Sequence, residues 1–457
     1  MLLPAVAVLS ALGFVIDDAL IVSRFAVVVH REGRHAFNAG GPAVDGVTPL
    51  VLPWLLAPLA SSVLESLAVQ RIAGAVAVMV GVGFLGNAIA RAFGRRAWMA
   101  MLVTCASFPL AVHAGSGLET GLVTGLVAAS LACFLSERGS LQGAWLLGAA
   151  ASLRPELVVG AFAAATPQLR VGKSWGVLAR VLGPAIATAA IRLAAFGRPF
   201  PLAVLAKPSD LTHGALYVAA GAIVSGLWVV VPAFASARVE EGEGSDDRRA
   251  AQRSATLLVT AHVAAVMAAG GDWMPYARLL VPVIPCMAVM LSAMPSGALR
   301  GLTCAVAMVA QLFFGWSHRA EATRVVADRL AVIERLRPAL QGQRVVAGLD
   351  LGTLGASHEG RIVDLAGLTM PEVARMQGGH TSKRIPEGFL DEQEVDALVL
   401  WAPNGSEVEI GPSALFGRAV ETRLARSPAV RASFKESKRV AWDSQGATLI
   451  VYVRTRP

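Results

Sequence analysis

Long apolar stretches, each closed by a short polar break, repeat along the first two thirds of the chain. Their lengths approach the roughly 17–25 residues that a helix needs to cross a bilayer. We therefore predict membrane-spanning helices in this part, instead of one large water-soluble core. The predicted segments are 1–16, 48–66, 71–92, 98–113, 118–135, 144–166, 175–196, 214–236, 254–270, 279–295 and 299–316.

The most charged break in this part gives the predicted orientation. The loop 238–253 contains several arginines, and such loops are usually cytoplasmic. Counting outward from this loop places the polar stretches 197–210 and 270–278 on the outer face. Everything after residue 317 is then also outside.

Two segments are irregular. An odd number of apolar segments lies between the loop after residue 16 and Glu119, so both cannot face the same side. The segment 48–66, which carries three prolines, is our candidate for one that does not cross. The segment 144–166 is interrupted by a charged and proline-containing stretch, 154–156, which predicts a broken helix.

From about residue 318 the pattern becomes that of a water-soluble domain. Charges become frequent, and apolar runs bounded by Gly and Asp shrink to strand length. These runs are 344–349, 396–402 and 447–453. The spacing of apolar residues predicts a helix over 321–338. We therefore predict two domains, a membrane domain over 1–317 and a small α/β domain over 318–457.

Composition agrees with a membrane protein. The 457-residue chain is 55% hydrophobic and 16% charged, whereas soluble proteins have about 25% charged residues. A net charge of +8 fits basic cytoplasmic loops and contact with anionic membrane lipid. No basic run alternates with aromatics, so we expect no nucleic-acid partner. All four cysteines lie in apolar segments, which argues against a disulfide framework or a zinc site.

Two adjacent acids, Asp17 and Asp18, follow the first apolar segment directly. Carboxylates are costly to place at the end of a membrane segment, so the pair indicates an active site at the membrane–water boundary. The stretch 19–29 after them is amphipathic and is expected to lie in the interface. The simpler alternative is that the acids cap the next helix, because Asp is a favoured N-cap residue.

Further polar residues collect at the predicted outer face. Acids among them suit general-base catalysis or metal binding, and Arg and Lys suit phosphate binding. They are Arg24, Asn38, His113, Glu119, Arg154, Glu156, Lys207, Asp272, Tyr276 and Arg278. Structural roles stay open for several of them. Glu119 would cap a helix, and an ion pair between Arg154 and Glu156 would stabilise a kink. Lys207 and Arg278 would contact lipid headgroups.

The order of short motifs resembles a known family. The stretch DDALIVSRFAVVVHREGRHAFNAGGPAVDGVT (17–48) looks like the first periplasmic loop of bacterial GT-C glycosyltransferases. It most resembles the branch that contains the terminal arabinofuranosyltransferases of actinobacterial cell walls. Further motifs similar to that branch are SGLET (116–120), RPEL (154–157), FGRPFPLAVLAK (196–207), GGDWMPYAR (270–278) and GRIVDLAGLTMPEVAR (360–375). The chain departs from the family pattern at Leu20, Asp45 and Val47, which leaves the sugar open.

The resemblance implies a mainly α, polytopic transmembrane fold of the GT-C type with a small C-terminal extracytoplasmic α/β domain. It implies an inner-membrane glycosyltransferase that uses a polyprenyl-phosphate-linked sugar and an envelope glycan or glycolipid acceptor at the outer face. Asp17 or Asp18 would be the general base. The residues assigned to the donor phosphate are Arg24, Lys207 and Arg278. Those assigned to substrate binding are Asn38, Glu119, Asp272 and Tyr276.

The sequence leaves alternatives open for the cofactor and for the class of function. No cofactor is certain, and a divalent metal (Mg, Mn or Ca) bound through Glu119 and Asp272 stays open. A lipid or solute transporter or flippase with an outer domain is a second function, and an inactive envelope scaffold is a third. Transporters place charges near the bilayer midplane. Here the polar groups are predicted at one face, which favours the transferase.

Overall fold

The chain folds into two compact units. The computed structural model describes residues 2–94, 96–136, 139–169, 174–207, 209–236, 245–295, 297–404 and 409–455. The first unit comprises Met1–Phe14, Gln70–Ile191 and Ser209–Thr323. The second comprises Val15–Val69, Arg192–Pro208 and Arg324–Pro457. The second unit thus joins the C-terminal part to two earlier segments, a combination that the sequence did not predict.

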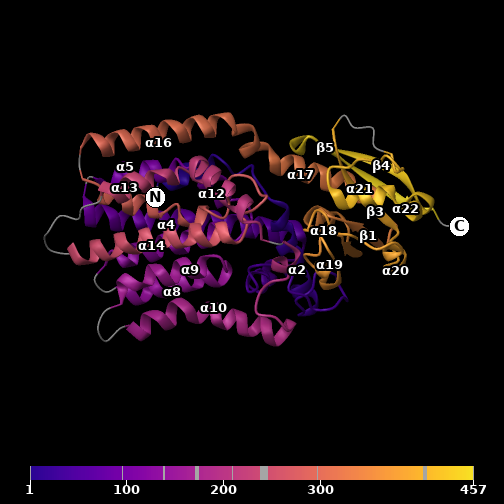
Figure 1. Cartoon of the computed structure of the whole chain (residues 1–457), viewed down its shortest axis with the longest axis horizontal. Coiled ribbons are helices and arrows are strands. Elements are labelled where there is room, and N and C mark those ends of the chain that lie inside the picture. The colour runs from indigo at the N-terminus through magenta and orange to yellow at the C-terminus, as the bar shows by residue number, and fades with distance from the viewer. Residues whose placement is uncertain are drawn as a thin grey trace. The chain divides into compact units, whose positions relative to one another are not determined.

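The first unit is a bundle of helices (Figure 1). It contains α1 (Leu2–Leu9), most of α4 (Val63–Phe93), α5 (Arg96–Cys105), α6 (Phe108–Ala114), α7 (Thr120–Phe134), α8 (Ser140–Leu153), α9 (Leu157–Ala165), η2 (Thr166–Gln168), most of α10 (Ser174–Phe196), α12 (Leu211–Ser225), η3 (Leu227–Val229), α13 (Val230–Ser236), α14 (Ser245–Ala268), η4 (Val281–Val283), α15 (Cys286–Ala293) and α16 (Ala298–Ser317). Helix α9 packs between α8 and α14, as Figure 1 shows.

Small residues let two of these helices approach closely. A Cβ atom added to Gly81 of α4 would overlap the backbone of Gly125 on α7, and one added to Gly125 would overlap the backbone of Ala77. No larger residue fits there unless a helix moves. Membrane helices pack in this way because lipid gives them no hydrophobic reason to associate.

Three helices within the described residues are long and apolar enough to cross a membrane. They are Val63–Phe93, Ser174–Phe196 and Ala298–Ala339. A fourth span results if the bent pair Leu211–Ser225 and Leu227–Ala235, which meet at 88°, counts as one. Helix α16 exposes Leu302, Val309 and Phe313, as expected for a helix that faces lipid. The chain is therefore a multi-pass membrane protein, as predicted.

Several predicted segments are not continuous helices. The segment 1–16 contains only α1, which has eight residues. The segment 48–66 contains two short helices and the start of α4, so it is not one continuous helix. Its prolines explain this, because each removes a helix hydrogen bond. The break at 154–156 is confirmed between α8 and α9. Part of the charged loop 238–253 lies outside the described residues.

The second unit combines short helices with one sheet. Its helices are α2 (Asp17–Glu32), α3 (Leu52–Leu56), η1 (Ala57–Leu59), α11 (Ala203–Ala206), most of α17 (Arg319–Ala339), α18 (Leu351–Ser357), α19 (Pro371–Arg375), α20 (Phe389–Glu392), α21 (Ala419–Arg426), α22 (Pro428–Ser433) and η5 (Asp443–Gln445). Its strands are β1 (Val345–Gly348), β2 (Arg361–Asp364), β3 (Ala397–Pro403), β4 (Phe434–Trp442) and β5 (Ala447–Arg454).

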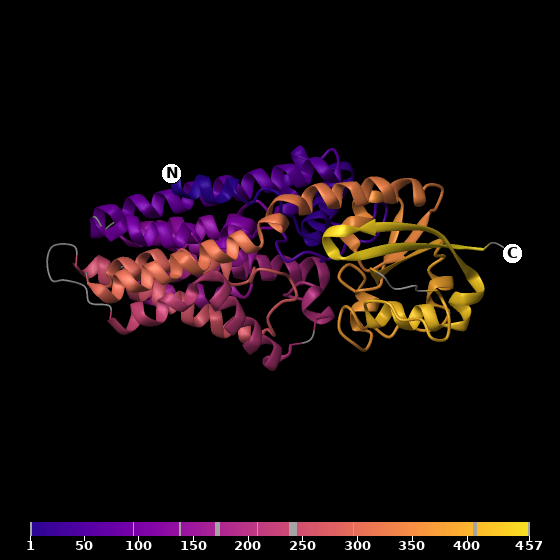
Figure 2. The same ribbon diagram turned by 90° about the horizontal axis from the view of Figure 1, so that it is seen from above.

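The strand order is β2-β1-β3-β5-β4. Strand β1 runs parallel to β2 and β3, whereas β5 runs antiparallel to β3 and β4. Figure 2 shows β4 and β5 as one long hairpin. The three predicted strands are confirmed as β1, β3 and β5. Strands β2 and β4 were missed, because one is short and the other reads FKESKRVAW, a charged pattern typical of a sheet edge.

Candidate active site

The side chains that the sequence assigns to the site are divided between the two units. The second unit contains Asp17, Asp18, Arg24, Asn38 and Lys207. The first contains Glu119, Asp272, Tyr276 and Arg278.

The carboxylate of Asp17 lies at the N-terminus of α18. Its Oδ2 accepts the backbone N–H of Gly352 at 2.8 Å. Its Oδ1 accepts the N–H and the hydroxyl of Thr353, both at 2.8 Å, and Nη1 of Arg329 at 2.8 Å. Free N–H groups at a helix N-terminus bind anions, so Asp17 caps α18. It does not cap its own helix, because the N-cap of α2 is Ile16 and no side chain caps that end.

The charge on Asp17 depends on its partners. Burial raises the pKa of Asp17 above its ordinary value, Arg329 opposes the rise and Asp350 adds to it. Arg329 is itself held, because it donates to the hydroxyl of Thr353 at 2.9 Å and lies 4.9 Å from the ring centre of Trp442. Loss of Arg329 would raise the pKa of Asp17 further and weaken the cap on α18.

Arg24 lies two turns further along α2, at the other end of α18. Its acceptors, at 2.6–3.3 Å, are the carbonyl oxygens of Phe37, Gly355, His358 and Gly360 and the side chain of Asn38. These five bonds use all five N–H groups of a guanidinium. No donor is left for a phosphate, so the geometry favours a structural role for Arg24 over the phosphate role that the sequence assigns.

Asn38 joins the first loop to the edge of the sheet. Its Nδ2 donates to the carbonyl oxygen of Ile362, and its Oδ1 accepts the N–H of Ile362, both at 2.9 Å. Ile362 belongs to β2, an edge strand whose outward N–H and C=O groups need partners. The amide therefore takes the place of a neighbouring strand, which favours a structural role over substrate binding.

Helix α2 is also more enclosed than expected. Every residue from 19 to 29 is buried, and the helix packs on α3 and α18. The sequence predicted an amphipathic stretch lying in the membrane interface, whereas the structure encloses this stretch in protein. Burial in the second unit, instead of contact with lipid, explains its apolar residues.

A buried ion pair that the sequence did not reveal fixes the end of the first loop. Arg192 donates from Nε to Oδ2 of Asp45 at 2.9 Å. Its Nη2 donates to the carbonyl oxygens of Val47 at 3.1 Å and Thr48 at 2.6 Å. Burial raises the pKa of Asp45, and Arg192 opposes that rise. The available signal was a single Arg near the end of the apolar segment 175–196.

Lys207 follows α11 directly. Within the part of the chain that the structure describes, its half-buried ammonium group has no hydrogen-bond or ion-pair partner. Helix α11 packs on α19, and the N–H of Leu202 donates to the carbonyl oxygen of Asp45 at 3.1 Å. The motif segments 196–207 and 360–375 therefore meet the first loop in one unit. A half-buried ammonium group in this position is suited to an anion.

In the first unit, Glu119 is paired with an arginine. Its Oε1 lies 2.7 Å from Nε of Arg154. Arg154 also lies 2.9 Å from Glu156 and donates to the hydroxyl of Thr120 at 2.8 Å. The predicted ion pair at the break between α8 and α9 is confirmed. Glu119 occupies the N-cap position of α7, but its side chain makes no capping bond.

The second candidate acid of this unit has the same kind of partner. Asp272 forms an ion pair with Arg278, and its Oδ1 accepts the N–H of Trp273 at 2.9 Å. Arg278 is near enough to Arg154 for their charges to interact. Both ion pairs are buried.

Tyr276 lies in a strained part of the same segment. Tyr276 and Ala277 have φ values of 60° and 50°, in the left-handed region that non-glycine residues rarely adopt. The hydroxyl of Tyr276 bonds the carboxylate of Glu321. Its ring packs edge-on against Phe14 and Phe108, at 5.5 and 5.0 Å between ring centres. Such strain is frequent at functional sites.

The carboxylates of the described residues do not form a metal site. No group of three or more His, Cys, Asp or Glu among them could hold an ion. Glu119 and Asp272, the ligands that the sequence offers, each bond an arginine instead. Their pairing with arginine disfavours Glu119 and Asp272 as metal ligands.

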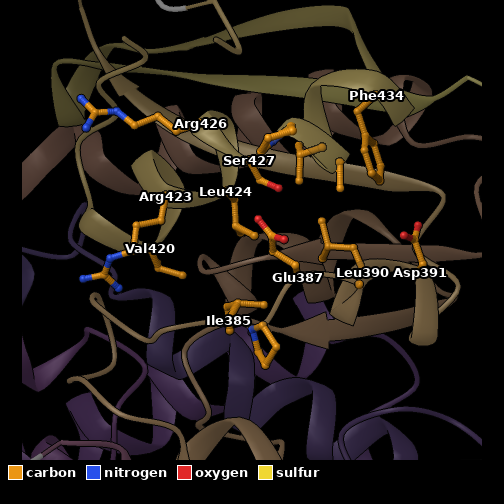
Figure 3. Close-up of a pocket in the computed structure, with 15 residues that line it drawn as sticks. Ile385, Glu387, Leu390, Asp391, Val420, Arg423, Leu424, Arg426, Ser427 and Phe434 are labelled. Atoms are coloured by element: carbon orange, nitrogen blue, oxygen red, sulfur yellow. The ribbon is translucent and has the colours of Figure 1, made fainter. Parts of the chain in front are cut away.

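The α/β domain contains a pocket of about 370 Å³ (Figure 3). Its apolar walls come from Leu390, Val420, Leu424, Val430 and Phe434. Arg423 and Arg426 point away from the centre in Figure 3 and donate to backbone carbonyl oxygens. Glu387 and Ser427 line the pocket with side chains that have no partner within the described residues. The pocket thus combines an apolar wall with two open hydrogen-bond acceptors.

The chain is mainly α, with one small sheet. The chain is similar to the crystal structure of ArnT from Cupriavidus metallidurans bound to undecaprenyl phosphate, with a TM-score of 0.57 and 13% identity over 98% of this chain and 96% of that chain. ArnT in the apo state gives 0.56 and 11% over the same shares. No protein-family model matches the chain, and no curated protein matches it in sequence. The likeness confirms the predicted mainly α, polytopic fold.

Proposed function

We propose that the chain is a membrane glycosyltransferase that moves a sugar from a polyprenyl-phosphate carrier to an envelope glycan or glycolipid. The observation that carries the proposal is the similarity, over 98% of the chain, to a GT-C glycosyltransferase solved with undecaprenyl phosphate. The order of the motifs resembles that of the branch that contains the arabinofuranosyltransferases. An arabinofuranose-like sugar is therefore the first donor to test. We place the reaction at the outer face of the inner membrane.

The donor phosphate needs a cation and no strong acid. The lipid phosphate leaves as an anion, so protonation contributes little, whereas charge stabilisation contributes much. Lys207 supports this role because its ammonium group has no partner within the described residues. Arg278 is the second candidate, and it would have to share its charge between the phosphate and Asp272.

The acceptor hydroxyl needs a base. In a single displacement, the acceptor oxygen forms a bond to the anomeric carbon while the bond from that carbon to the phosphate oxygen breaks. The hydroxyl proton passes to a carboxylate of the pair Asp17/Asp18, and the configuration inverts. A positioned base of this kind contributes typically about 10²–10⁴-fold.

The pocket of the α/β domain supports acceptor binding. Glu387 and Ser427 offer oxygens that accept hydrogen bonds from sugar hydroxyls, and Phe434 offers an aromatic surface for an apolar sugar face. The arginines beside the pocket are occupied by carbonyl oxygens, which disfavours an anionic ligand. We therefore assign the pocket to a neutral part of the acceptor glycan.

The test is transfer by purified protein in proteoliposomes that contain a labelled polyprenyl-phosphate pentose or hexose and envelope glycan fragments. We expect label in the glycan, and a loss of about tenfold or more in Lys207→Gln from weaker phosphate binding. Lys435→Gln, an exposed change on β4, is the matched control. Movement of the intact donor across the bilayer without transfer would instead show a flippase.

A further inference from the structure

We propose that an open groove beside α2 binds an acidic part of the acceptor, a saccharide that carries carboxylate or phosphate groups. The proposal rests on the proposed function and deepens it, because it names the chemistry of the acceptor. We call this site the α2 groove. It is lined by one face of α2 and by residues from 62–64, 337–343 and 355–360. All of these segments belong to the second unit.

The α2 groove has the size and the walls of a saccharide site. Its volume is about 920 Å³, near the upper end of the roughly 300–1,000 Å³ that is usual for ligand pockets. Val27, Val28 and Leu340 supply aliphatic walls, which suit the apolar face of a sugar ring. Gln341 and Gln343 add side-chain amides, which both donate and accept hydrogen bonds as sugar hydroxyls do. The space exceeds what a single ion needs.

Two exposed arginines lie at the α2 groove with free N–H donors. Arg337 donates from Nη2 to the carbonyl oxygen of Ala356 at 3.3 Å. Within the part of the chain that the structure describes, Arg31 has no hydrogen-bond or ion-pair partner. A guanidinium group presents paired donors that match two oxygens of a carboxylate or phosphate group. The free donors therefore favour an oxyanion over a neutral ligand.

The charges that line the α2 groove are unbalanced. They are Arg24, Arg31 and Arg337 against one acid, Glu359. Arg24 and Arg31 are about two turns of α2 apart, so they lie on one face of the helix. Burial lowers the pKa of Arg24 to about 10, Glu359 opposes this effect and Arg31 adds to it. An anion in the groove would offset the repulsion between the two arginines.

The position of the α2 groove suits a part of the acceptor remote from the reacting hydroxyl. Helix α2 begins with Asp17 and Asp18, the acid pair that the proposed function uses as base. Arg31 lies roughly four turns, about 20 Å, further along the same helix. An oxyanion held by Arg31 would therefore anchor the acceptor at a distance from the reaction and leave the hydroxyl free to react.

Binding by the full chain in detergent tests the proposal without any sugar donor. The probes are a galacturonic acid trimer, its neutral methyl ester and glucose 6-phosphate, titrated by calorimetry at low ionic strength. The trimer tests carboxylates and the sugar phosphate tests phosphate. We expect at least one acidic probe to bind about fivefold or more tightly than the methyl ester, and added salt to weaken that binding. If neither acidic probe binds more tightly than the methyl ester, the proposal is overturned.

Variants locate the binding. Arg31→Gln and Arg337→Gln should each weaken binding of the acidic probe about threefold, and the double variant about tenfold, as expected for exposed ion pairs. Glu359→Gln removes the opposing acid and should tighten binding about twofold, a gain that poor folding would not produce. Arg335→Gln, an exposed change on α17 outside the groove, is the matched control and should leave the Kd almost unchanged. Unchanged affinity in the double variant would overturn the proposal.

Transfer assays separate this proposal from the proposed function. With an acidic acceptor fragment, the double variant should raise the acceptor KM about tenfold, and with a neutral fragment it should raise the KM much less. If the wild-type protein transfers no sugar, the proposed function fails while the titrations still decide the occupant of the α2 groove. If nanodiscs that contain phosphatidylglycerol abolish binding of the acidic probe, the groove is a lipid site and the proposal is overturned.

Discussion

Arg192→Gln should be among the most destabilising single changes in the second unit. The side chains of Arg192 and Asp45 are 3% and 0% exposed, so water screens the pair very little. The change removes the charge opposite Asp45 and weakens the two bonds to the carbonyl oxygens of Val47 and Thr48. Breaking a buried ion pair by removing one partner costs about 3–5 kcal/mol. We expect a loss of this size in the free energy of unfolding.

The assay is denaturant unfolding in mixed micelles, combined with a double-mutant cycle. Asp45→Asn removes the stranded charge, so the double variant should be less destabilised than the sum of the two single variants. Arg180→Gln, an exposed change on the same helix, should have an effect below about 0.5 kcal/mol. A loss below about 1 kcal/mol in Arg192→Gln, or strict additivity in the cycle, would refute the reasoning.

Three further predictions follow from single sites. Burial, with Arg192 adding to the effect, lowers the pKa of His35 to about 4, so the folded state keeps it neutral. The free energy of unfolding should therefore be highest above about pH 6.5 and fall by about 3 kcal/mol as the pH drops toward 4. In His35→Phe the melting temperature should depend less on pH over this range. Gly125→Leu should force α4 and α7 apart and lower the melting temperature in detergent, whereas Gly183→Leu, where no atom lies nearby, should not. Glu387→Gln should weaken binding of neutral glycan fragments about tenfold in saturation-transfer NMR, and unchanged binding would remove the acceptor role of the pocket.

Much of the fold could be predicted because its signals are local. Long apolar runs indicated helices, the Arg154–Glu156 interruption correctly indicated a break, and short β-branched runs marked β1, β3 and β5. Strand β4 escaped because an edge strand exposes charged residues on both faces, which removes the alternation that marks a strand. The division into units escaped because segments 15–69 and 192–208 join the C-terminal part through contacts that no local pattern records.

The site was harder to predict because its contacts are long-range. The sequence singled out Asp17 and Arg24, but several of their partners lie more than 300 residues away. Asp17 and Arg24 also hold a helix, a role that a list of polar residues does not reveal. Asp272 and Arg278 lie six residues apart and bond each other, a pairing that the sequence analysis did not foresee. The residue type alone shows that a charged side chain is costly to bury at a position. The structure is needed to show which partner offsets that cost.

The most direct test of the central claim is the initial rate of sugar transfer by the purified protein from a polyprenyl-phosphate donor, measured for the wild-type protein and for the double variant Asp17→Asn, Asp18→Asn. We predict that the wild-type protein moves labelled pentose to an envelope glycan and releases polyprenyl phosphate in equal amount, and that the double variant loses at least about a hundredfold. Absence of transfer by the wild-type protein from both pentose and hexose donors, in proteoliposomes where its fold is intact, would contradict the account.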